Sequence, residues 1–431
     1  VTVFIKQGMN LRWDSDKTIE EMVNQGVRNA YLDKGNPLRA SIVKNPISER
    51  LNTKDNSPAV VHVSLVPGGD LDISIAAKGA GSENKAVLGM LNPSDNIVDF
   101  ILGEIPKMGA GWCPPGVLGI GIGGTADKAM VMAKESLFET IDIQELKKRG
   151  PSNKIESLRV ELYEKINLLG IGAQGLGGLT TVLDVKIKDY PTHAASLPVA
   201  IIPNCAANRH IHFKMSGDGP VKLKPPNLEV WPKAEWSPKE TSTRVNIDTL
   251  QKKDLGKFKL GESLLLSGKI LTARDAAHKK LKELADNNQP LPDGLDLKNR
   301  FIYYVGPVDP VGNEVVGPAG PTTSSRMDKY SSLMLEDYEI IGMIGKAERG
   351  KEALESIKKN KAIYLIAVGG SAYLISQAIK SSKLIAFPEL GMEAIYEFEV
   401  EDMPVTLAAN TDGESLHEEG VKKWNAVLMK D

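Results

Sequence analysis

Two cysteines carry the most reactive side chains in this 431-residue chain. Cys113 lies in the stretch GWCPPGVLGIGIGG at 111–124, directly before two prolines, and Cys205 ends the apolar run LPVAIIPNC at 197–205. A thiolate is a nucleophile and a metal ligand, whereas a thiol in an apolar strand is most often a small buried side chain. Because two cysteines cannot form a disulfide framework, two interpretations stay open: buried thiols in a reducing cytosol, or a thiolate site.

The glycines that follow Cys113 suggest a different chemistry. Gly119 to Gly124 fit the pattern G-x-G-x-x-G, after an apolar stretch and before an expected helix at 125–138, as in a dinucleotide-binding loop. Against an NAD(P)-dependent dehydrogenase, residues 141–154 are polar and helical in pattern where that fold needs a second strand. The alternative is a tight turn that packs a strand against a helix. The chain contains no G-x-x-x-x-G-K-[ST] phosphate loop.

The remaining candidates are histidines and scattered cations. Histidine occurs six times, at positions 62, 193, 210, 212, 278 and 417. His210 and His212 would share one face of a strand, but no third metal ligand is evident nearby, so exposed imidazoles are the simpler interpretation. Basic residues stand in Gly-, Thr- or Asn-rich segments at expected element ends: Arg39, Lys78, Lys85, Arg274, Arg326 and Lys346. Singly such residues are usually surface charges, but guanidinium groups suit carboxylates, and together they predict a shared anion site.

The hydrophobic pattern predicts the elements that position these residues. In the first half we expect strands at 1–5, 60–66, 71–79, 180–191 and 197–205, and helices at 96–108, 125–138 and 157–170. The strands at 60–66 and 71–79 are expected to pair around Pro-Gly-Gly-Asp. In the second half we expect strands at 263–273 and 300–306, a helix at 274–287, a strand–turn–helix at 362–379 and paired strands at 395–410.

The predicted fold class is α/β. Two mixed α/β domains, residues 1–215 and 244–431, are joined by a Pro/Lys-rich linker at 216–243.

Composition narrows the class of protein. Hydrophobic residues make up 42% and charged residues 25%, and the net charge is −2, so no overall field recruits nucleic acid or an anionic membrane. No apolar run approaches the roughly 20 residues that span a bilayer, and the N-terminus lacks the features of a signal peptide. We therefore expect a cytoplasmic protein. Because the chain begins on a strand without a methionine, we also expect residues upstream of Val1.

Seven stretches in order carry a resemblance to a known family. They are AKGAGSENK, GWCPPGVLGIGIGGTADKA, LLGIGAQGLGG, DYPTHAASLPVAIIPNCAANRHI, ARDAAH, GPTTSSRMD and FPELGMEAI. Together they resemble class I fumarate hydratase, the iron–sulfur hydro-lyase family that also includes tartrate dehydratase. The resemblance joins the family's α-type cluster region, about 1–215, to its β-type swivelling region, about 243–425. In the family the first cluster cysteine lies in a Cys-Gln-Asp-Thr-Gly stretch before the strand that opens this chain, so a third ligand is implied upstream.

The resemblance implies a reaction, a cofactor and a set of roles. Cys113 and Cys205 become ligands of a [4Fe-4S] cluster whose open iron is a Lewis acid for the reversible hydration of fumarate to (S)-malate, a citric acid cycle reaction. The substrate, a small dicarboxylate, is held by Arg39, Gly81 through its backbone, Arg274, Arg326 and Lys346. Thr322 is implied as the base at carbon and His193 as the proton-transfer group on the hydroxyl side. The glycines of 119–124 become a close turn beside the cluster.

Two further expectations and three alternatives accompany this assignment. The implied residues come from both halves of the chain, so the site is expected between domains. The resemblance also implies a homodimer. The nearest alternative is tartrate dehydratase or another hydroxy-diacid hydro-lyase. More distant ones are an NAD(P)-dependent dehydrogenase using Gly119–Gly124 and a binding module without a cluster.

Overall fold

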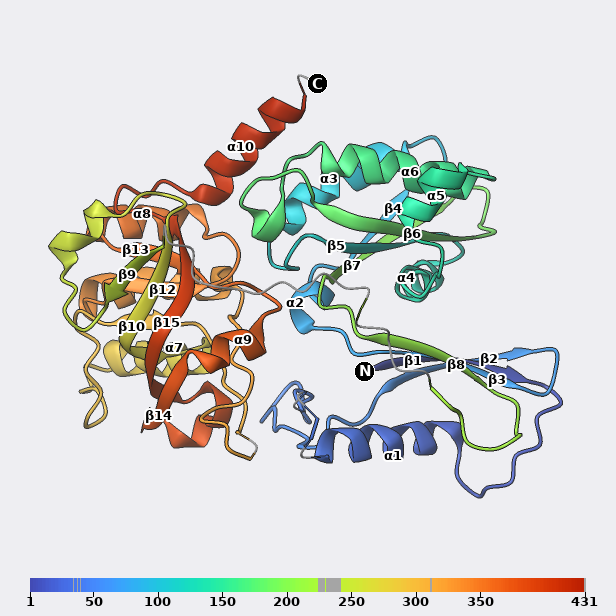
Figure 1. The fold of residues 1–431 in the computed structure, drawn as a ribbon, viewed down its shortest axis with the longest axis horizontal. Coiled ribbons are helices and arrows are strands. Elements are labelled where there is room, and N and C mark those ends of the chain that lie inside the picture. Colours follow the sequence, from blue (N-terminus) through green and yellow to red (C-terminus); the bar gives the residue numbers. More distant parts are fainter. Residues whose placement is uncertain are drawn as a thin grey trace. The chain divides into compact units, whose positions relative to one another are not determined.

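The computed structural model describes residues 1–33, 35–36, 38, 40–223, 229, 242–310 and 312–429. They form two compact units, the first made of Val1–Gly79, Phe138–Thr140 and Ala207–Ser237, and the second of Ala80–Leu137, Ile141–Ala206 and Pro238–Asp431. Both units contain helices and mixed sheets, which confirms the predicted α/β class (Figure 1). The second unit draws on both halves of the chain. Most of the predicted linker, 224–228 and 230–241, lies outside the described residues.

A four-stranded sheet and one helix make up the first unit. Its elements are β1 (Thr2–Gly8), α1 (Ile19–Leu32), β2 (Val60–Val66), β3 (Leu71–Ala76) and β8 (His210–Met215), and the strand order is β2-β1-β3-β8. The predicted β2–β3 hairpin is wrong, because β1 lies between them, parallel to β2 and antiparallel to β3. β1 takes the central position because Val3, Phe4 and Ile5 bury both of its faces, whereas β2 is a largely exposed edge strand.

The second unit contains a four-stranded sheet covered on both faces. Its strands are β4 (Val87–Leu91), β5 (Gly116–Gly123), β6 (Val182–Tyr190) and β7 (Leu197–Cys205), in the order β4-β7-β5-β6. Its helices are α2 (Ala80–Glu83), α3 (Ile97–Met108), α4 (Ala126–Ser136), α5 (Ile143–Arg149) and α6 (Lys154–Asn167). Helix α4 packs on one face of the sheet, and α3 and α6 cover the other (Figure 1).

The glycines after Cys113 do not form the turn that the sequence suggested. Gly119 and Gly121 lie inside strand β5, and only Gly123 and Gly124, with φ of 87° and 71°, turn the chain towards α4. A Cβ on Gly119 or Gly121 would overlap a backbone carbonyl oxygen of α4. These two glycines therefore let helix α4 approach the strand, and they are not part of a phosphate-binding loop ahead of that helix.

The remaining strands of the second unit close into a barrel. They are β9 (Thr243–Asn246), β10 (Ser263–Thr272), β11 (Phe301–Tyr303), β12 (Gly342–Gly345), β13 (Ile363–Ile366), β14 (Ile379–Ala386) and β15 (Ile395–Ala409). The order is β14-β15-β13-β12-β11-β10-β9, and β15 pairs also with β10, which closes the ring. The predicted pair of strands at 395–410 is wrong: β15 is one strand, bent at Asp402 (φ 50°) where the register shifts.

Alternate residues of the barrel strands fill two separate cores. Phe301, Tyr303 and Val305 belong to one apolar cluster, whereas Ile302 and Tyr304 belong to the other. The second cluster is covered by α7 (Asp275–Asp286) and α8 (Lys351–Asn360), while α9 (Ala372–Gln377) contributes to the first. This alternation, with period two, is what a barrel with a covered outer face requires.

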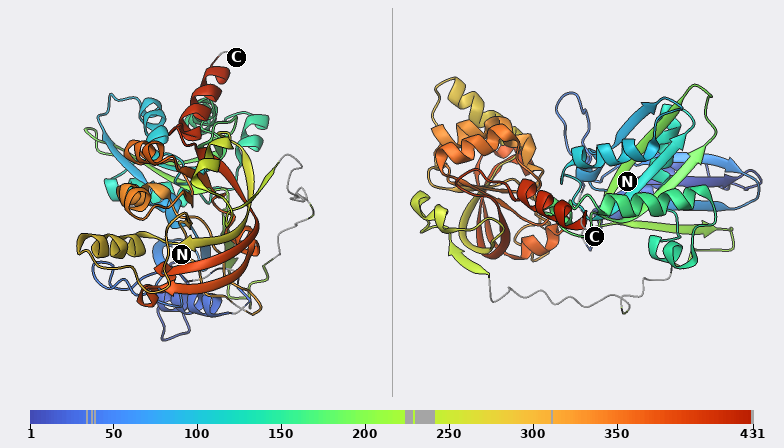
Figure 2. Two further views of the ribbon diagram at one scale, coloured as in Figure 1. Left: turned by 90° about the vertical axis from the view of Figure 1, so that its left-hand side faces the viewer. Right: turned by 90° about the horizontal axis from the view of Figure 1, so that it is seen from above.

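The C-terminal helix connects the barrel to the layer that contains the β4-β7-β5-β6 sheet of the same unit. Helix α10 (Leu416–Leu428) follows β15 and ends the described chain (Figure 2). The Asn425 side-chain amide donates to the carbonyl of Leu168 at 3.2 Å, and Gly420 packs so closely on the carbonyl of Leu176 that a Cβ would overlap it. No helix among the described residues is long and apolar enough to cross a membrane.

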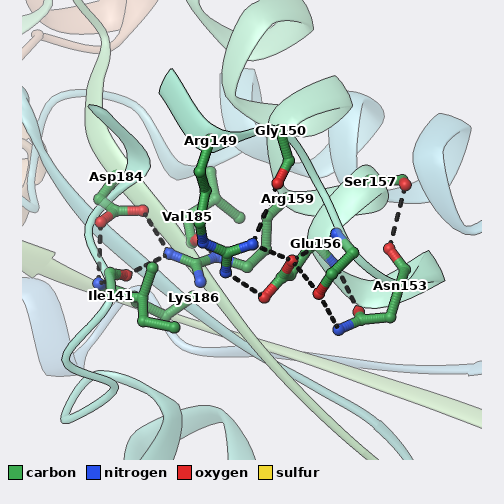
Figure 3. Close-up of polar contacts among 11 residues, drawn as sticks. Ile141, Arg149, Gly150, Asn153, Glu156, Ser157, Arg159, Asp184, Val185 and Lys186 are labelled. Atoms are coloured by element: carbon green, nitrogen blue, oxygen red, sulfur yellow. Dashed lines mark hydrogen bonds and ion pairs between the residues drawn. The ribbon is translucent and has the colours of Figure 1, made fainter. Parts of the chain in front are cut away.

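A buried charge network ties helix α6 to strand β6 (Figure 3). The Arg159 guanidinium donates to the carbonyl oxygens of Val185 (2.7 Å) and Ile141 (2.8 Å) and to the Asp184 carboxylate (3.3 Å). The Lys186 ammonium lies 2.9 Å from the same carboxylate and donates to Ile141 as well. Because these charges are paired and hydrogen-bonded with each other, the cost of burying them is offset, and the network connects α6 to β6.

Substituting Gly121 by alanine should destabilise the second unit. The new Cβ would overlap the carbonyl oxygen of Ala129 and lie 2.7 Å from the amide nitrogen of Ala133, so α4 must move off the sheet. We expect a loss of about 1–3 kcal/mol in the free energy of unfolding, measured by urea titration with circular dichroism. The matched control is Gly103→Ala in α3, where a Cβ meets no atom within 4 Å and should stabilise the helix slightly. Equal stability of the two variants would contradict the packing role of Gly121.

Candidate active site

Cys113 lies in the connection between helix α3 and strand β5. Its side chain is 6% exposed, and its amide donates to the carbonyl of Ala110 at 2.9 Å. The residue adopts a left-handed φ of 60°, which is uncommon for a side chain with a Cβ and costs on the order of 1–3 kcal/mol. Such a conformation persists only where the surrounding structure holds it, and it often marks a functional position.

The two cysteines lie close to one another, near the same end of the sheet. Cys205 ends strand β7, where it is paired with Gly116, the first residue of the neighbouring strand β5. The pKa of the Cys113 thiol is raised, chiefly by burial; Lys346 opposes the rise and Cys205 adds to it. Burial thus favours the neutral thiol, and the nearby cation is the group that favours the thiolate.

Lys346 brings a positive charge directly to this thiol. It follows strand β12, and its Nζ lies 3.1 Å from Cys113 Sγ and 3.3 Å from the carbonyl oxygen of Gly111. A Cβ on Gly81 would lie 2.7 Å from the same ammonium, so that glycine leaves room for the Lys346 side chain. The half-buried Lys85 packs in the same way on Gly111. Its Cε lies 2.7 Å from the position that a Cβ on Gly111 would take. Glycine therefore lines the approach to both lysines.

The segment after Pro321 lies beside Lys346. The amide of Thr322 donates to the carbonyl of Tyr304 at 2.7 Å, and the carbonyl of Thr322 accepts from the amide of Lys346 at 3.3 Å. Arg326, four residues on, donates through Nε and Nη2 to the Asp275 carboxylate, at 3.0 and 2.6 Å. Asp275 holds this guanidinium through one edge only, so its Nη1 is available to a second anion.

Arg274 directly precedes Asp275 and caps helix α7. Its Nη2 lies 3.5 Å from the Glu393 carboxylate, while its buried Nε has no hydrogen-bond partner among the described residues. A buried N–H of a charged group without a partner is costly, so the guanidinium of Arg274 is incompletely satisfied by the described residues. Asp275, which follows Arg274 in the chain, pairs with Arg326, so the two predicted anion-binding arginines share one neighbour.

A buried histidine supports Arg274 from behind. His278 is fully buried, stacks on Tyr330 with ring centroids 5.5 Å apart, and contacts the carbonyl of Arg274 through Nδ1 at 2.8 Å. Because a carbonyl only accepts, Nδ1 carries the proton. Burial lowers the pKa of His278 to about 4, against smaller opposing effects of the Arg274 carbonyl and Asp275. The imidazole is therefore neutral at pH 7 and adds no charge beside the guanidinium.

One predicted site residue lies outside the described part of the chain, and another is not brought to this place. Arg39 lies outside the described residues. His193 is exposed in the connection between β6 and β7, and its Nδ1 accepts from the amide of Ala195 at 3.1 Å. Cys205 ends β7 and His193 precedes its start, so at about 3.3 Å per residue the strand separates them by ~26 Å.

Sequence analysis missed two polar residues that reach the Cys113 loop. Gln174 lies within the quoted stretch LLGIGAQGLGG, where a polar side chain among glycines was the available signal. The amide of Gln174 donates to the carbonyl of Pro114 at 2.6 Å. Glu348 accepts from the amide of Ala110 at 2.8 Å, and no motif singled it out.

Two other features of the described residues add no site here. No group of three or more His, Cys, Asp or Glu side chains in the described part of the chain could hold a metal ion. A cavity of about 790 Å³ lies at the other end of the barrel strands, lined by residues 247–253, Lys269 and 298–301, and it shares none of the residues above.

Comparison with known proteins assigns the class. A family model described as "Fumarate hydratase (Fumerase)" matches residues 1–214, and one described as "Fumarase C-terminus" matches residues 217–420. Hence the chain is an enzyme, a hydro-lyase.

The relatives narrow the class to one family. "Fumarate hydratase 2" of Leishmania major is 33% identical over 420 residues, which cover 92% of this chain and 72% of that protein. "Fumarate hydratase class I, anaerobic" of Escherichia coli K12 is 31% identical, over 95% of this chain and 77% of its own length. The chain belongs to the class I fumarate hydratase family. A "Putative L(+)-tartrate dehydratase subunit alpha" of Methanocaldococcus jannaschii is 43% identical over 214 residues, 48% of this chain and 72% of that subunit.

The buried His278 predicts a pH dependence of stability. Its folded-state pKa of about 4 lies below the unfolded value of about 6.5. Between these values the unfolded chain binds a proton that the folded protein excludes, so stability falls as the pH drops from 6.5 to 4, by about 3 kcal/mol in all. Replacing His278 by asparagine should flatten the dependence of the urea midpoint on pH in this window. His193→Asn, at an exposed histidine, is the control and should leave the slope unchanged; an equal slope in both variants would contradict the assignment.

Proposed function

We propose that this hydro-lyase catalyses the reversible hydration of fumarate to (S)-malate with a [4Fe-4S] cluster. The observation that carries the proposal is the 3.1 Å contact between the buried Cys113 thiol and the Lys346 ammonium. The class I family is iron–sulfur dependent. A citric acid cycle role and a cytoplasmic location are part of the same proposal.

The residues present fit part of a cluster site. Iron–sulfur clusters take cysteine thiolates, and Cys113 and Cys205 are two thiols near one another at one end of a sheet. Lys346 favours the thiolate form that iron needs. We propose that both hold the cluster and that a third thiolate comes from the Cys-Gln-Asp-Thr-Gly stretch of the family. When bound, such a cluster supplies a Lewis acid for the hydroxyl group of malate.

The cations then have defined tasks in the reaction. Hydration adds a proton to one carbon of fumarate and hydroxide to the other, and negative charge builds on the neighbouring carboxylate in the transition state. We propose that Arg274, Arg326 and Lys346 bind and neutralise the carboxylates, together with Arg39 and the backbone of Gly81. Preorganised donors of this kind are each worth roughly 2.7–4 kcal/mol of barrier. Thr322 is proposed as the base at carbon, where Lys346 adjoins its backbone.

His193 is proposed to act on a second subunit. It lies ~26 Å along β7 from Cys205, too far to transfer a proton at the site of its own chain. A homodimer would let the exposed β6–β7 connection of one chain reach the Cys113 site of the other. The proposed proton transfer on the hydroxyl side therefore requires the dimer.

Tartrate dehydration is the second candidate. The observation in its favour is the 43% identity, over 214 residues that cover 48% of this chain, to a putative tartrate dehydratase subunit. Tartrate carries one more hydroxyl than malate, and polar contacts to that hydroxyl would decide between them.

The full-length protein, reconstituted anaerobically with iron and sulfide, should hydrate fumarate. The Cys113→Ser/Cys205→Ser double variant should be inactive, and Arg274→Met should lower kcat/KM by roughly 100- to 1,000-fold because it removes one preorganised cation. Arg244→Met is the control, since that arginine pairs with Asp402 on the surface. Turnover of malate and tartrate in parallel separates the two candidates, and an active double cysteine variant would refute the cluster mechanism.

Heterodimers test the placement of His193. We expect Cys113→Ser and His193→Asn each to be inactive as homodimers. A purified heterodimer of the two should recover about half of the wild-type activity, because one of its two sites has both residues intact. Activity is measured as fumarate consumption after tandem affinity purification. An inactive heterodimer, or an active His193→Asn homodimer, would contradict the role across subunits.

A further inference from the structure

The loop that carries Cys113 is held by side chains from distant parts of the second unit. Lys346 and Glu348 come from the chain after β12, and Gln174 comes from the chain before β6. Lys346 contacts Gly111 and Cys113, whereas Glu348 contacts the residues that open the loop. The fumarate mechanism uses the Lys346 contact and leaves Gln174 and Glu348 without a role.

Gln174 forms hydrogen bonds with two backbone segments next to the Cys113 thiol, at Pro114 and at Gly369. Its backbone amide donates to the carbonyl of Pro114 at 2.6 Å, which fixes the chain immediately after Cys113. Its side-chain Oε1 accepts from the amide of Gly369 at 3.0 Å. Gly369 packs directly on Cys113 Sγ, so closely that a Cβ at 369 would overlap the sulfur. The Gln174 side chain thus holds the backbone wall that covers the thiol.

Glu348 holds the start of the same loop. Its Oε2 accepts from the amide of Ala110 at 2.8 Å, and a Cβ on Gly109 would overlap its carboxylate. The next residue, Arg349, is buried and donates to Asp328 at 2.6 Å and to Ser331 at 2.7 Å. Because these hydrogen bonds hold Arg349, they also restrict the neighbouring Glu348, whose carboxylate then holds the start of the loop in one position.

Unusual backbone conformations gather at these contacts. Cys113, Gln174 and Ala347 have φ of 60°, 56° and 65°, although none is glycine. The carbonyl of Ala347 accepts from the Tyr364 hydroxyl at 2.8 Å, so the segment between Lys346 and Glu348 is also held. Left-handed non-glycine residues persist only where surrounding contacts over-determine them. Three of them around one thiol indicate that its position is set by these contacts.

We propose that Gln174 and Glu348 are positioning residues that set the Cys113 thiol beside Lys346 and shield it until iron is bound. Gln174 acts through the acceptor Oε1 and Gly369, and Glu348 acts through the acceptor Oε2 and Ala110. The positioning of Cys113 does not depend on the proposed function. Only the consequence of that positioning for iron binding rests on the proposed function.

Paired variants separate the acceptor from the rest of each side chain. Gln174→Met and Glu348→Met remove the acceptor, whereas Gln174→Glu and Glu348→Gln keep one; all four leave the backbone amides in place. The first measurement is the alkylation rate of Cys113 relative to Cys205 by iodoacetamide in cluster-free protein, read by peptide mass. The second is the iron retained after anaerobic reconstitution and desalting.

We expect the Met variants to raise the Cys113-to-Cys205 alkylation ratio about fivefold, as the loss of one hydrogen bond allows. Iron retention should fall by a similar factor, and the acceptor-keeping variants should stay within about twofold of wild type. Gln144→Met, at an exposed glutamine of α5, is the matched control and should change neither measurement.

The outcomes distinguish this inference from the proposed function. General loosening would raise alkylation of both cysteines and leave their ratio unchanged, which would overturn the positioning role. So would Met variants that match wild type, or acceptor-keeping variants that behave like the Met variants. If wild-type protein retains no iron, the proposed function fails, while the alkylation ratio still decides the positioning of Cys113.

Discussion

The contact between the Lys346 ammonium and the Cys113 thiol is the interaction on which the second unit's site depends. Burial raises the pKa of Cys113, and Lys346 opposes that rise. The two residues are 233 positions apart and come from different layers, Cys113 from the chain before β5 and Lys346 from the chain after β12. A 3.1 Å contact between them requires the barrel and the β4-β7-β5-β6 sheet to be held in one arrangement. The contacts of α10 with Leu168 and of Glu348 with Ala110 hold these two layers together.

Glycine is the means by which these layers come so close. Gly81 and Gly111 leave room for the two lysines, Gly369 lies on the sulfur, and Gly121 lets α4 reach the sheet. At each position the space for a Cβ is already occupied by a neighbouring atom. The glycine-rich stretches of the sequence therefore encode close packing around a thiol, and the resemblance to a nucleotide loop arises because both uses need the same small residue.

Much of this could be predicted from the sequence, and the rest depends on pairing between distant segments. Local patterns gave the boundaries of α3, α7 and β7 closely, because amphipathic periodicity and continuous apolar runs are local properties. The central place of β1 was missed, since nothing in the local pattern says which strand inserts between two others. Gly81, Lys346 and Cys113 were each singled out, but their meeting follows from topology. His193 was predicted from the same resemblance. Cys205 ends β7, however, whereas His193 lies beyond the opposite end of that strand.

The arrangement around Arg274 explains why a neutral histidine lies behind a cluster of cations. Arg274 pairs with Glu393 at 3.5 Å and Arg326 with Asp275 at 2.6 Å, so two guanidinium groups lie near the N-terminus of α7. A charged imidazole at position 278 would add to this charge in a fully buried position, where desolvation makes it most costly. Burial between Tyr304 and Tyr330 keeps His278 neutral and leaves its Nδ1–H to fix the carbonyl of Arg274. The Nε of Arg274 has no hydrogen-bond partner in the described part of the chain, so the packing that stabilises α7 leaves this guanidinium incompletely satisfied.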